Sequence, residues 1–208
     1  MKDKYDFILQ HCIDKRVIDI GGADYNHYFS YGKGDWWLHG RISKVAKYVI
    51  GVENNNYWVC KLKKEGYNFY YADAEHIGNY ITPHQFDIIV LGDVLEHLSR
   101  PGSFLESVKK IIPKSLIITT PNQFYFYFII KALFNKGWEE TATDHVAVYS
   151  KQTLIQLLER HGYNIVEFEW LSTIQGNCFE RLVKRIMFNI FPQLSAKIGI
   201  VCTLNTIS

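Results

Sequence analysis

Two acidic residues and a histidine lie close together in the segment DVLEH at residues 93–97. Positions i, i+3 and i+4 share one side of a helical turn, so we expect Asp93, Glu96 and His97 to point the same way. His145, in a later Asp-His pair, is the fourth residue of this candidate site. A histidine can take a proton as a general base. Two carboxylates with an imidazole also suit Mg²⁺ or Mn²⁺, and a metal lowers the pKa of a bound hydroxyl. The segment therefore predicts a site of proton transfer or metal binding.

A purely structural role is the competing interpretation. Glu96 can pair with Arg100 at i+4, and His97 can simply cap the floor of a crevice. Two adjacent carboxylates without a cation repel each other, and one is driven towards protonation. We expect no ammonium group beside Asp93 and Glu96, so either a metal ion or Arg100 must relieve that repulsion.

A second set of residues follows the apolar segments that are expected to form strands. It consists of Asp19, Gly21, Gly22, Glu53, Asn54, Asp73, Ala74 and Gly92. A nucleoside needs an acid for its ribose hydroxyls, a polar contact for its adenine, and close backbone approach to its charged tail. A single acid at a strand end is often only a solvated cap. Four strand ends meeting at one edge favour a bound nucleoside.

The elements that must position these residues alternate between strands and helices. Buried strands are expected at 16–21, 48–53, 67–71, 86–91, 115–119, 164–170 and 198–204, and helices at 4–14, 38–47, 56–65, 101–110, 151–161 and 179–192. This alternation predicts a doubly wound α/β fold with a mostly parallel sheet covered on both faces. The last helix and strand depart from this alternation, which suits a final strand that is inserted into the sheet as part of a hairpin-like pair.

Composition bounds the class of protein. With 208 residues, 48% of them hydrophobic, the chain is expected to form one domain over residues 1–208, with an N-terminal helix within 1–14. A net charge of +2 argues against nucleic acid as a partner. The four cysteines are scattered, and no signal-peptide core precedes residue 16, so we expect a cytoplasmic protein.

The pieces VIDIGG, VIGVENN, FYYADAE, FDIIVLGDVLEHL, LIITTPN and DHVAVYSKQTLIQLLERHGY together resemble class I S-adenosylmethionine (SAM)-dependent methyltransferases. The resemblance covers nearly all of residues 14–204. It implies a seven-stranded Rossmann-like sheet with the last strand antiparallel, and SAM as cofactor. By position, it implies that Gly21 and Gly22 approach the methionine part of SAM, that Glu53 binds the ribose, and that Asp73 lies by the adenine.

The chain departs from the family's D-x-G-x-G-x-G pattern, because Ala23 and Tyr25 stand where later glycines are usual. The long stretch Tyr25–Gly40 is expected to form a different pocket wall. An altered loop keeps open a non-catalytic partner protein with the methyltransferase fold. An NAD-binding oxidoreductase is disfavoured, since no G-x-G-x-x-G follows the first strand.

The segment at 93–97 resembles the E-x-x-E-H sequence of two O-methyltransferase groups, those of ubiquinone biosynthesis and the small-RNA 2′-O-methyltransferases. Here the first acid is Asp93, one methylene shorter. The resemblance implies O-methylation of a small-molecule, sugar or lipid-linked hydroxyl. RNA 2′-O-methylation is the alternative, against which the near-neutral charge counts.

An almost wholly apolar segment, Phe124–Phe134, follows the fifth strand. It is expected to be either a core helix or part of a substrate lid within residues 121–149. Together with the basic, apolar segment Arg181–Phe191, it is a candidate for peripheral contact with a lipid tail or a membrane surface.

Overall fold

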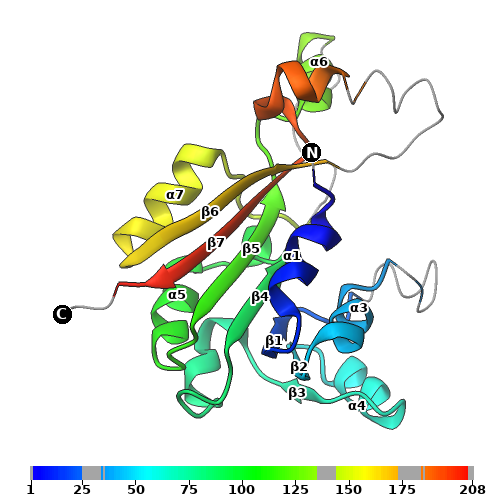
Figure 1. Cartoon of the computed structure of the whole chain (residues 1–208), viewed down its shortest axis with the longest axis vertical. Helices are drawn as coiled ribbons and strands as arrows, with labels where there is room; N and C mark the ends of the chain where they lie inside the picture. Colours follow the sequence, from blue (N-terminus) through cyan, green and yellow to red (C-terminus); the bar gives the residue numbers. More distant parts are fainter. Residues whose placement is uncertain are drawn as a thin grey trace.

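The computed structural model describes residues 2–24, 34, 36–134, 144–172, 184 and 186–205. Its centre is a seven-stranded sheet in the order β3-β2-β1-β4-β5-β7-β6 (Figure 1). The strands are β1 (Arg16–Ile20), β2 (Tyr48–Glu53), β3 (Phe69–Tyr71), β4 (Ile88–Gly92), β5 (Ser115–Pro121), β6 (Tyr163–Leu171) and β7 (Lys197–Leu204). All seven strands lie where the sequence predicts them, within a few residues at each end.

The sheet is parallel from β3 through β5, and β7 runs antiparallel to both of its neighbours, β5 and β6. β1 pairs with β2 on one side and with β4 on the other, so strand order reverses beside β1. A crevice is expected at such a switch point, outside the carboxyl ends of the strands. The predicted insertion of the last strand is confirmed, because β7 lies between β5 and β6.

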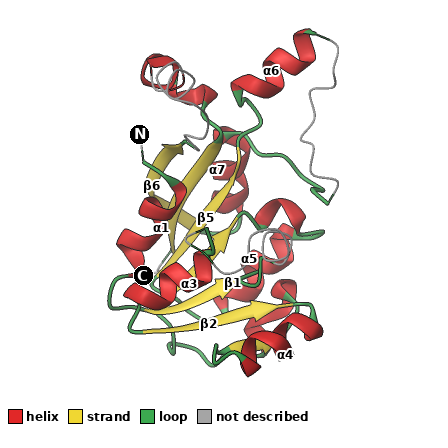
Figure 2. Ribbon diagram, turned by 90° about the vertical axis from the view of Figure 1, so that its right-hand side faces the viewer, coloured by secondary structure: helices red, strands yellow, loops and turns green. Residues whose placement is uncertain are grey.

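Helices cover both faces of the sheet (Figure 2). α1 (Lys4–Cys12) and α3 (Leu38–Val45) pack on the face that carries Val17 and Val90. α5 (Pro101–Lys109) and α7 (Lys151–Arg160) pack on the opposite face, while α4 (Asn56–Lys64) covers β3. Successive residues of a strand point to opposite faces, so these apolar runs supply two core layers at once. The doubly wound fold is therefore confirmed.

Local signals explain where several helices begin and end. The side chain of Asn55 accepts from the backbone N–H groups of Tyr57 and Trp58 and so begins α4. The chain leaves α4 at Gly66, whose φ of +89° suits a residue without a side chain. Ser150 and Thr153 form a reciprocal capping box at the start of α7.

In the described part of the chain, three short 3-10 helices are not anticipated by the sequence patterns: η1 (Ala74–Asn79), η2 (Leu95–His97) and η3 (Pro192–Leu194). α6 (Phe126–Leu133) is a helix, but none of its residues is buried, so a core helix is the wrong interpretation of this segment. Of the helix expected at 179–192, residues 184 and 186–190 are helical and residues 179–183 and 185 lie outside the described residues.

Much of the predicted lid and pocket wall also lies outside the described residues, namely 25–33, 35 and 135–143. Cys12, Cys60 and Cys202 carry free thiols, and Cys178 falls in an undescribed stretch. None of the helices in the described part of the chain is long and apolar enough to cross a membrane.

Candidate active site

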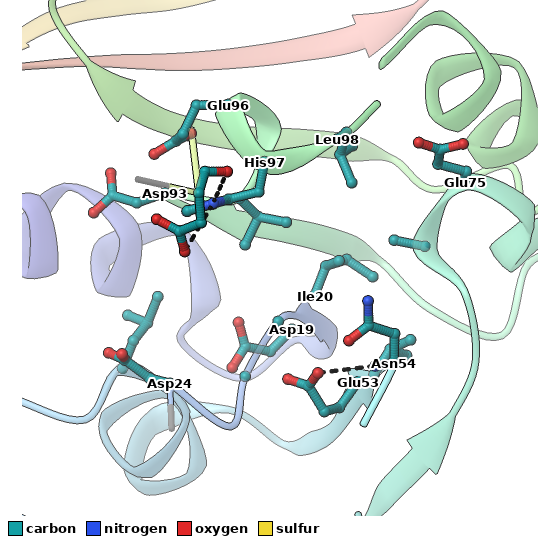
Figure 3. A pocket seen from close by; sticks show the side chains of 18 of the residues that line it. Asp19, Ile20, Asp24, Glu53, Asn54, Glu75, Asp93, Glu96, His97 and Leu98 are labelled. Atoms are coloured by element: carbon teal, nitrogen blue, oxygen red, sulfur yellow. Dashed lines mark hydrogen bonds and ion pairs between the residues drawn. The ribbon is translucent and has the colours of Figure 1, made fainter. Parts of the chain in front are cut away.

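A pocket of about 850 Å³ opens at the carboxyl ends of β1, β2 and β4 (Figure 3). Every residue predicted for the site from the sequence lines it, both the proposed nucleoside contacts and the residues of the 93–97 segment with His145. Asp19, Glu53 and Asn54 lie together on one side, and Asp93, Glu96 and His97 lie together on another (Figure 3). The topology thus joins the two sets of residues in one cavity.

The turn after β1 is tightly packed. Gly21 has a φ of +69°, and a Cβ atom on it would lie 2.8 Å from Val94 Cγ2. A Cβ atom on Gly22 would lie 2.5 Å from Asp19 Oδ2. A side chain would be crowded at both positions, and the two glycines line the pocket.

Asp19 is fully buried, and its Oδ2 lies 3.0 Å from Nδ1 of the equally buried His39. Burial raises the pKa of the Asp19 carboxyl, and the hydrogen bond with His39 opposes that rise. Trp37 lies beside His39 and donates from Nε1 to the carbonyl of Gly22 at 2.8 Å. The side chains that follow the long connection after β1 thus support the glycine turn from behind.

Glu53 ends β2, and its Oε1 accepts from the backbone N–H groups of Asn54 at 2.9 Å and Asn55 at 3.3 Å. Burial raises the pKa of Glu53, and these backbone N–H groups partly offset the rise. The carboxylate is held in one orientation at the wall of the pocket. It is the kind of group that accepts hydrogen bonds from vicinal hydroxyls.

Asp73 lies at the open side of the pocket with its side chain 53% exposed, and its Oδ1 caps the N–H of Glu75 at 2.9 Å. Glu75 is buried and binds Arg100 through the backbone N at 2.7 Å and through Nε at 2.8 Å. The predicted pairing of Arg100 with Glu96 is therefore wrong. The chain turns after η2 so that Arg100 faces the η1 segment instead.

Asp93 has a φ of +61°, which is rare for a residue with a side chain. Its Oδ2 accepts from Lys4 Nζ at 2.9 Å and from Lys197 Nζ at 2.7 Å, and its Oδ1 accepts from Thr119 at 3.2 Å. Burial opposes ionisation, but the two ammonium groups outweigh it and hold the pKa of Asp93 well below its usual range. The expectation that no ammonium group lies beside these acids is wrong, because α1 and β7 each bring a lysine from a distant part of the sequence.

Glu96 is 1% exposed, and its Oε2 accepts from Thr120 Oγ1 at 3.0 Å. Its Oε1 is buried and has no hydrogen-bond partner among the described residues. Burial, and then the nearby charge of Asp93, raise the pKa of Glu96 to about 8. An acidic group with such a pKa exchanges its proton near neutral pH.

His97 Nδ1 lies 3.2 Å from the carbonyl oxygen of Asp144 and 3.4 Å from its Oδ2. Since a carbonyl only accepts, Nδ1 carries the hydrogen, and Nε2 is left as the proton acceptor in the neutral ring. The rings of His97 and His145 pack edge to face with centroids 4.5 Å apart. Asp144 and His145, far along the chain, thus complete the cavity.

Ligand atoms of Glu96, His97 and His145 all lie within 4.8 Å of one another. Asp93 does not belong to this cluster among the described residues, because φ of +61° turns its side chain towards the lysines. The predicted four-residue metal site is thus reduced to a carboxylate and two imidazoles. The helical-turn spacing fails here because η2 begins only at Leu95.

Several residues that shape the site were not identified from the sequence. Lys4, Lys197, Thr120 and Glu75 are ordinary in type and carry no local spacing signal. Lys197 reaches the pocket because the sheet order places β7 beside β5, and Lys4 because α1 packs against β4. Thr120 contacts Glu96 from β5, and Glu75 lines the pocket from η1. Only the topology, and no motif, could have revealed them.

The site fits SAM. The glycine turn leaves backbone close to the cavity, the Glu53 carboxylate is fixed and largely desolvated, and Asp73 has an exposed carboxylate at the pocket's open side. The cationic sulfonium and ammonium of SAM also suit a lining rich in carboxylates. Residues Gly21, Gly22, Glu53 and Asp73 are thus suited to hold the cofactor.

Comparisons with known proteins agree with this architecture. A family model described as a methyltransferase domain matches residues 1–168. A SAM-dependent methyltransferase from Archaeoglobus fulgidus is similar in structure, with a TM-score of 0.58, 19% identity, and coverage of 96% of this chain and 89% of that one. No curated protein matches the sequence.

Two further structures have the same fold. Magnesium protoporphyrin IX methyltransferase from Synechocystis, solved with bound S-adenosylhomocysteine (SAH), has a TM-score of 0.63 at 11% identity, covering 97% of this chain and 82% of that one. The small RNA methyltransferase HEN1 has a TM-score of 0.60 at 19% identity, covering 99% of this chain and 25% of that one. The match to the methyltransferase domain model favours a methyltransferase over the alternatives of an oxidoreductase and a non-catalytic partner protein. The chain belongs to the methyltransferase domain family and is a SAM-dependent methyltransferase.

Proposed function

We propose that the enzyme methylates oxygen, on a hydroxyl of a small molecule, a sugar or a lipid-linked compound. The observation that supports this best is the hydrogen bond of His97 Nδ1 to the carbonyl of Asp144 at 3.2 Å. It leaves Nε2 of His97 as a proton acceptor in the pocket, beside Glu96 and His145. A hydroxyl acceptor needs such a base, because it must lose its proton when its oxygen gains a methyl group.

The residues that line the pocket have separate roles in this reaction. Bound SAM supplies an electrophilic methyl group. Glu53 would hold the ribose through its carboxylate, Gly21 and Gly22 would let the backbone approach the methionine part, and Asp73 would hold the adenine. His97 takes the acceptor's proton at Nε2, and the hydrogen bond of Nδ1 to the Asp144 carbonyl fixes the orientation of the ring.

A divalent ion such as Mg²⁺ or Mn²⁺ is a second element of the proposal. Glu96, His97 and His145 would hold it, and the orphan Oε1 of Glu96 would gain a partner. The ion would lower the pKa of an acceptor hydroxyl. If the ion is bound, His97 is a metal ligand and not a base. Measuring activity in excess chelator therefore distinguishes the two roles.

RNA 2′-O-methylation has less support. Among the described residues, eight acidic side chains line the pocket against three basic ones, which are Lys4, Arg100 and Lys197. Phosphate groups bind best to a surplus of basic side chains. The chain as a whole has a net charge of only +2.

The test uses isotopically labelled SAM with separate fractions of small molecules, lipids and total RNA, and mass spectrometry of the labelled product. We expect label on oxygen, in the small-molecule or lipid fraction. His97→Gln should reduce turnover by about 10²–10⁴-fold and leave SAM affinity unchanged. His161→Gln, at a histidine that pairs with Glu106 away from the pocket, is the matched control.

Label on nitrogen, or only in RNA, would contradict the proposal. Full turnover by His97→Gln would remove His97 from the chemistry. Activity that persists in excess chelator assigns His97 as the base, whereas activity lost with chelator and restored by Mg²⁺ or Mn²⁺ assigns the ion.

A further inference from the structure

Two helical segments project from the sheet beyond the carboxyl end of β5 (Figures 1 and 2). They are α6 and the helical residues 186–190, which together with Phe134 and Phe191 we call the apolar projection. Several of its large apolar side chains face solvent, namely Tyr127, Ile130, Leu133, Phe134, Ile190 and Phe191. Leu133 is 77% exposed and Phe134 is 71% exposed. Such a concentration of exposed apolar side chains marks an interaction surface.

The projection is a built part of the fold and not a frayed end. The rings of Phe126 and Phe188 meet edge to face with centroids 5.9 Å apart, so the two segments contact each other at their bases. Asn122, which is fully buried, donates from Nδ2 to the carbonyls of Gln193 at 2.8 Å and Ser195 at 2.7 Å. These bonds hold the residues that lead into α6 against the residues that follow the second segment, and we call these two stretches the roots of the projection.

The charges around the apolar projection favour one kind of partner. Residues 122–134 and 186–196 contain no aspartate or glutamate. Lys131 lies over the ring of Tyr127, 4.8 Å from its centroid, and Lys184 adjoins the second segment. Aromatic rings with lysines and without acids suit the interface of a bilayer that carries anionic headgroups. A second copy of this chain would instead bring like charges together.

The position of the projection relates it to the pocket. Pro121 and Lys197 are paired across β5 and β7, and both line the pocket. α6 begins at Phe126, and the second segment ends at Phe191, so both join the sheet beside the cavity. We propose that the apolar projection docks the enzyme on the surface of an anionic lipid bilayer. The side of the pocket that Pro121 and Lys197 line, where the methyl acceptor would enter, then lies next to the membrane.

Flotation with lipid vesicles tests this. We compare vesicles of phosphatidylcholine mixed with phosphatidylglycerol against vesicles of phosphatidylcholine alone. The wild-type protein should float with the anionic vesicles and much less with the neutral ones. Ile130→Asp/Leu133→Asp should lower the partition coefficient by about tenfold or more, because two exposed apolar side chains are replaced by carboxylates that anionic headgroups repel.

The matched control is Tyr57→Asp/Tyr80→Asp, which changes two exposed apolar residues away from the projection. It should float as the wild type does. SAM affinity, measured by calorimetry, should be unchanged in both double variants, since none of these side chains lines the pocket. Retained SAM binding also shows that the variants fold.

Three results would overturn the docking. They are no flotation of the wild-type protein, an equal loss in the control variant, or a dimer in sedimentation velocity that Ile130→Asp/Leu133→Asp dissolves. Equal flotation with neutral vesicles would overturn the requirement for anionic lipid. The inference does not depend on O-methylation, so vesicle binding and the methylated atom are measured independently.

Discussion

Asp93 and Glu96 line the same pocket, and their carboxyl pKa values are shifted in opposite directions. Lys197 and Lys4 outweigh burial and lower the pKa of Asp93, whereas burial and the charge of Asp93 raise the pKa of Glu96 to about 8. One acid is thus kept ionised and its neighbour is kept protonated around neutral pH. Pairs of acids whose environments separate their pKa values in this way are typical of sites of proton transfer.

The first prediction concerns stability against pH. The pKa of Glu96 rises from an ordinary 4.5 to about 8 on folding. The stabilisation that protonated Glu96 gives the folded state is therefore fully present below pH 4.5 and is lost as pH rises to about 8. Glu96→Gln removes the titrating group. Between pH 4.5 and about 8, the unfolding free energy of this variant should therefore fall less than that of the wild type. Urea titrations at several pH values measure this. Parallel curves for the two proteins would contradict the raised pKa.

The second prediction concerns the lysines on Asp93. Lys197→Met should lower the unfolding free energy by about 1.5–3 kcal/mol, because a hydrogen bond to a charged group is lost while Lys4 still neutralises Asp93. Lys4→Met/Lys197→Met should cost more than the sum of the single variants, since it leaves a buried carboxylate unpaired.

Lys114→Met is the matched control for that series. Lys114 pairs with Asp87 at 3.2 Å, but its side chain is 79% exposed, and Arg16 also binds Asp87. We expect a change within about 0.5 kcal/mol. Simple additivity of the two lysine variants would show that Asp93 does not depend on them jointly.

The third prediction concerns cofactor binding. Glu53→Gln should weaken SAM affinity by about tenfold or more, because a hydrogen bond to a charged group contributes roughly 1.5–3 kcal/mol. Isothermal titration calorimetry measures the affinity. Glu159→Gln, at an exposed carboxylate on α7, is the control and should bind as the wild type does. Equal affinity of Glu53→Gln would remove Glu53 from the site.

The fourth prediction concerns the root of the apolar projection. Asn122→Ala removes the donors to two main-chain carbonyls and leaves those groups without that partner. We expect a loss of about 2–4 kcal/mol in the free energy of unfolding. Asn79→Ala, which removes only an exposed bond from Lys110, should cost less than about 1 kcal/mol. A loss as small as that of the control would mean that the two roots are held by other contacts.

The strands and most helices could be predicted because local patterns determine them. β-branched runs such as Val17–Ile20 read the same way in isolation as in the sheet, and Asn55 caps α4 through neighbours only two and three residues away. The residues at strand ends could be placed together for a related reason, since parallel strands bring their carboxyl ends to one edge.

The contacts of the site could not be predicted, because they depend on long-range packing. Nothing near Asp93 in the sequence indicates Lys4 or Lys197, which lie 89 and 104 residues away. The spacing of Glu96 and Arg100 suits a helix, but the backbone there is a short 3-10 turn followed by an extended residue, Leu98. Spacing arguments are sound only where the assumed element forms.

The position of β7 also affects the order in which the protein can fold during translation. β7 lies between β5 and β6, and its first residue, Lys197, supplies one of the ammonium groups on Asp93. On a ribosome, β1 to β5 can pair while β7 is still inside the exit tunnel, and Asp93 then lacks this partner. β6 cannot reach its final place in the sheet until β7 arrives. A chain in which only β1 to β5 have paired therefore has an incomplete pocket until β7 is inserted.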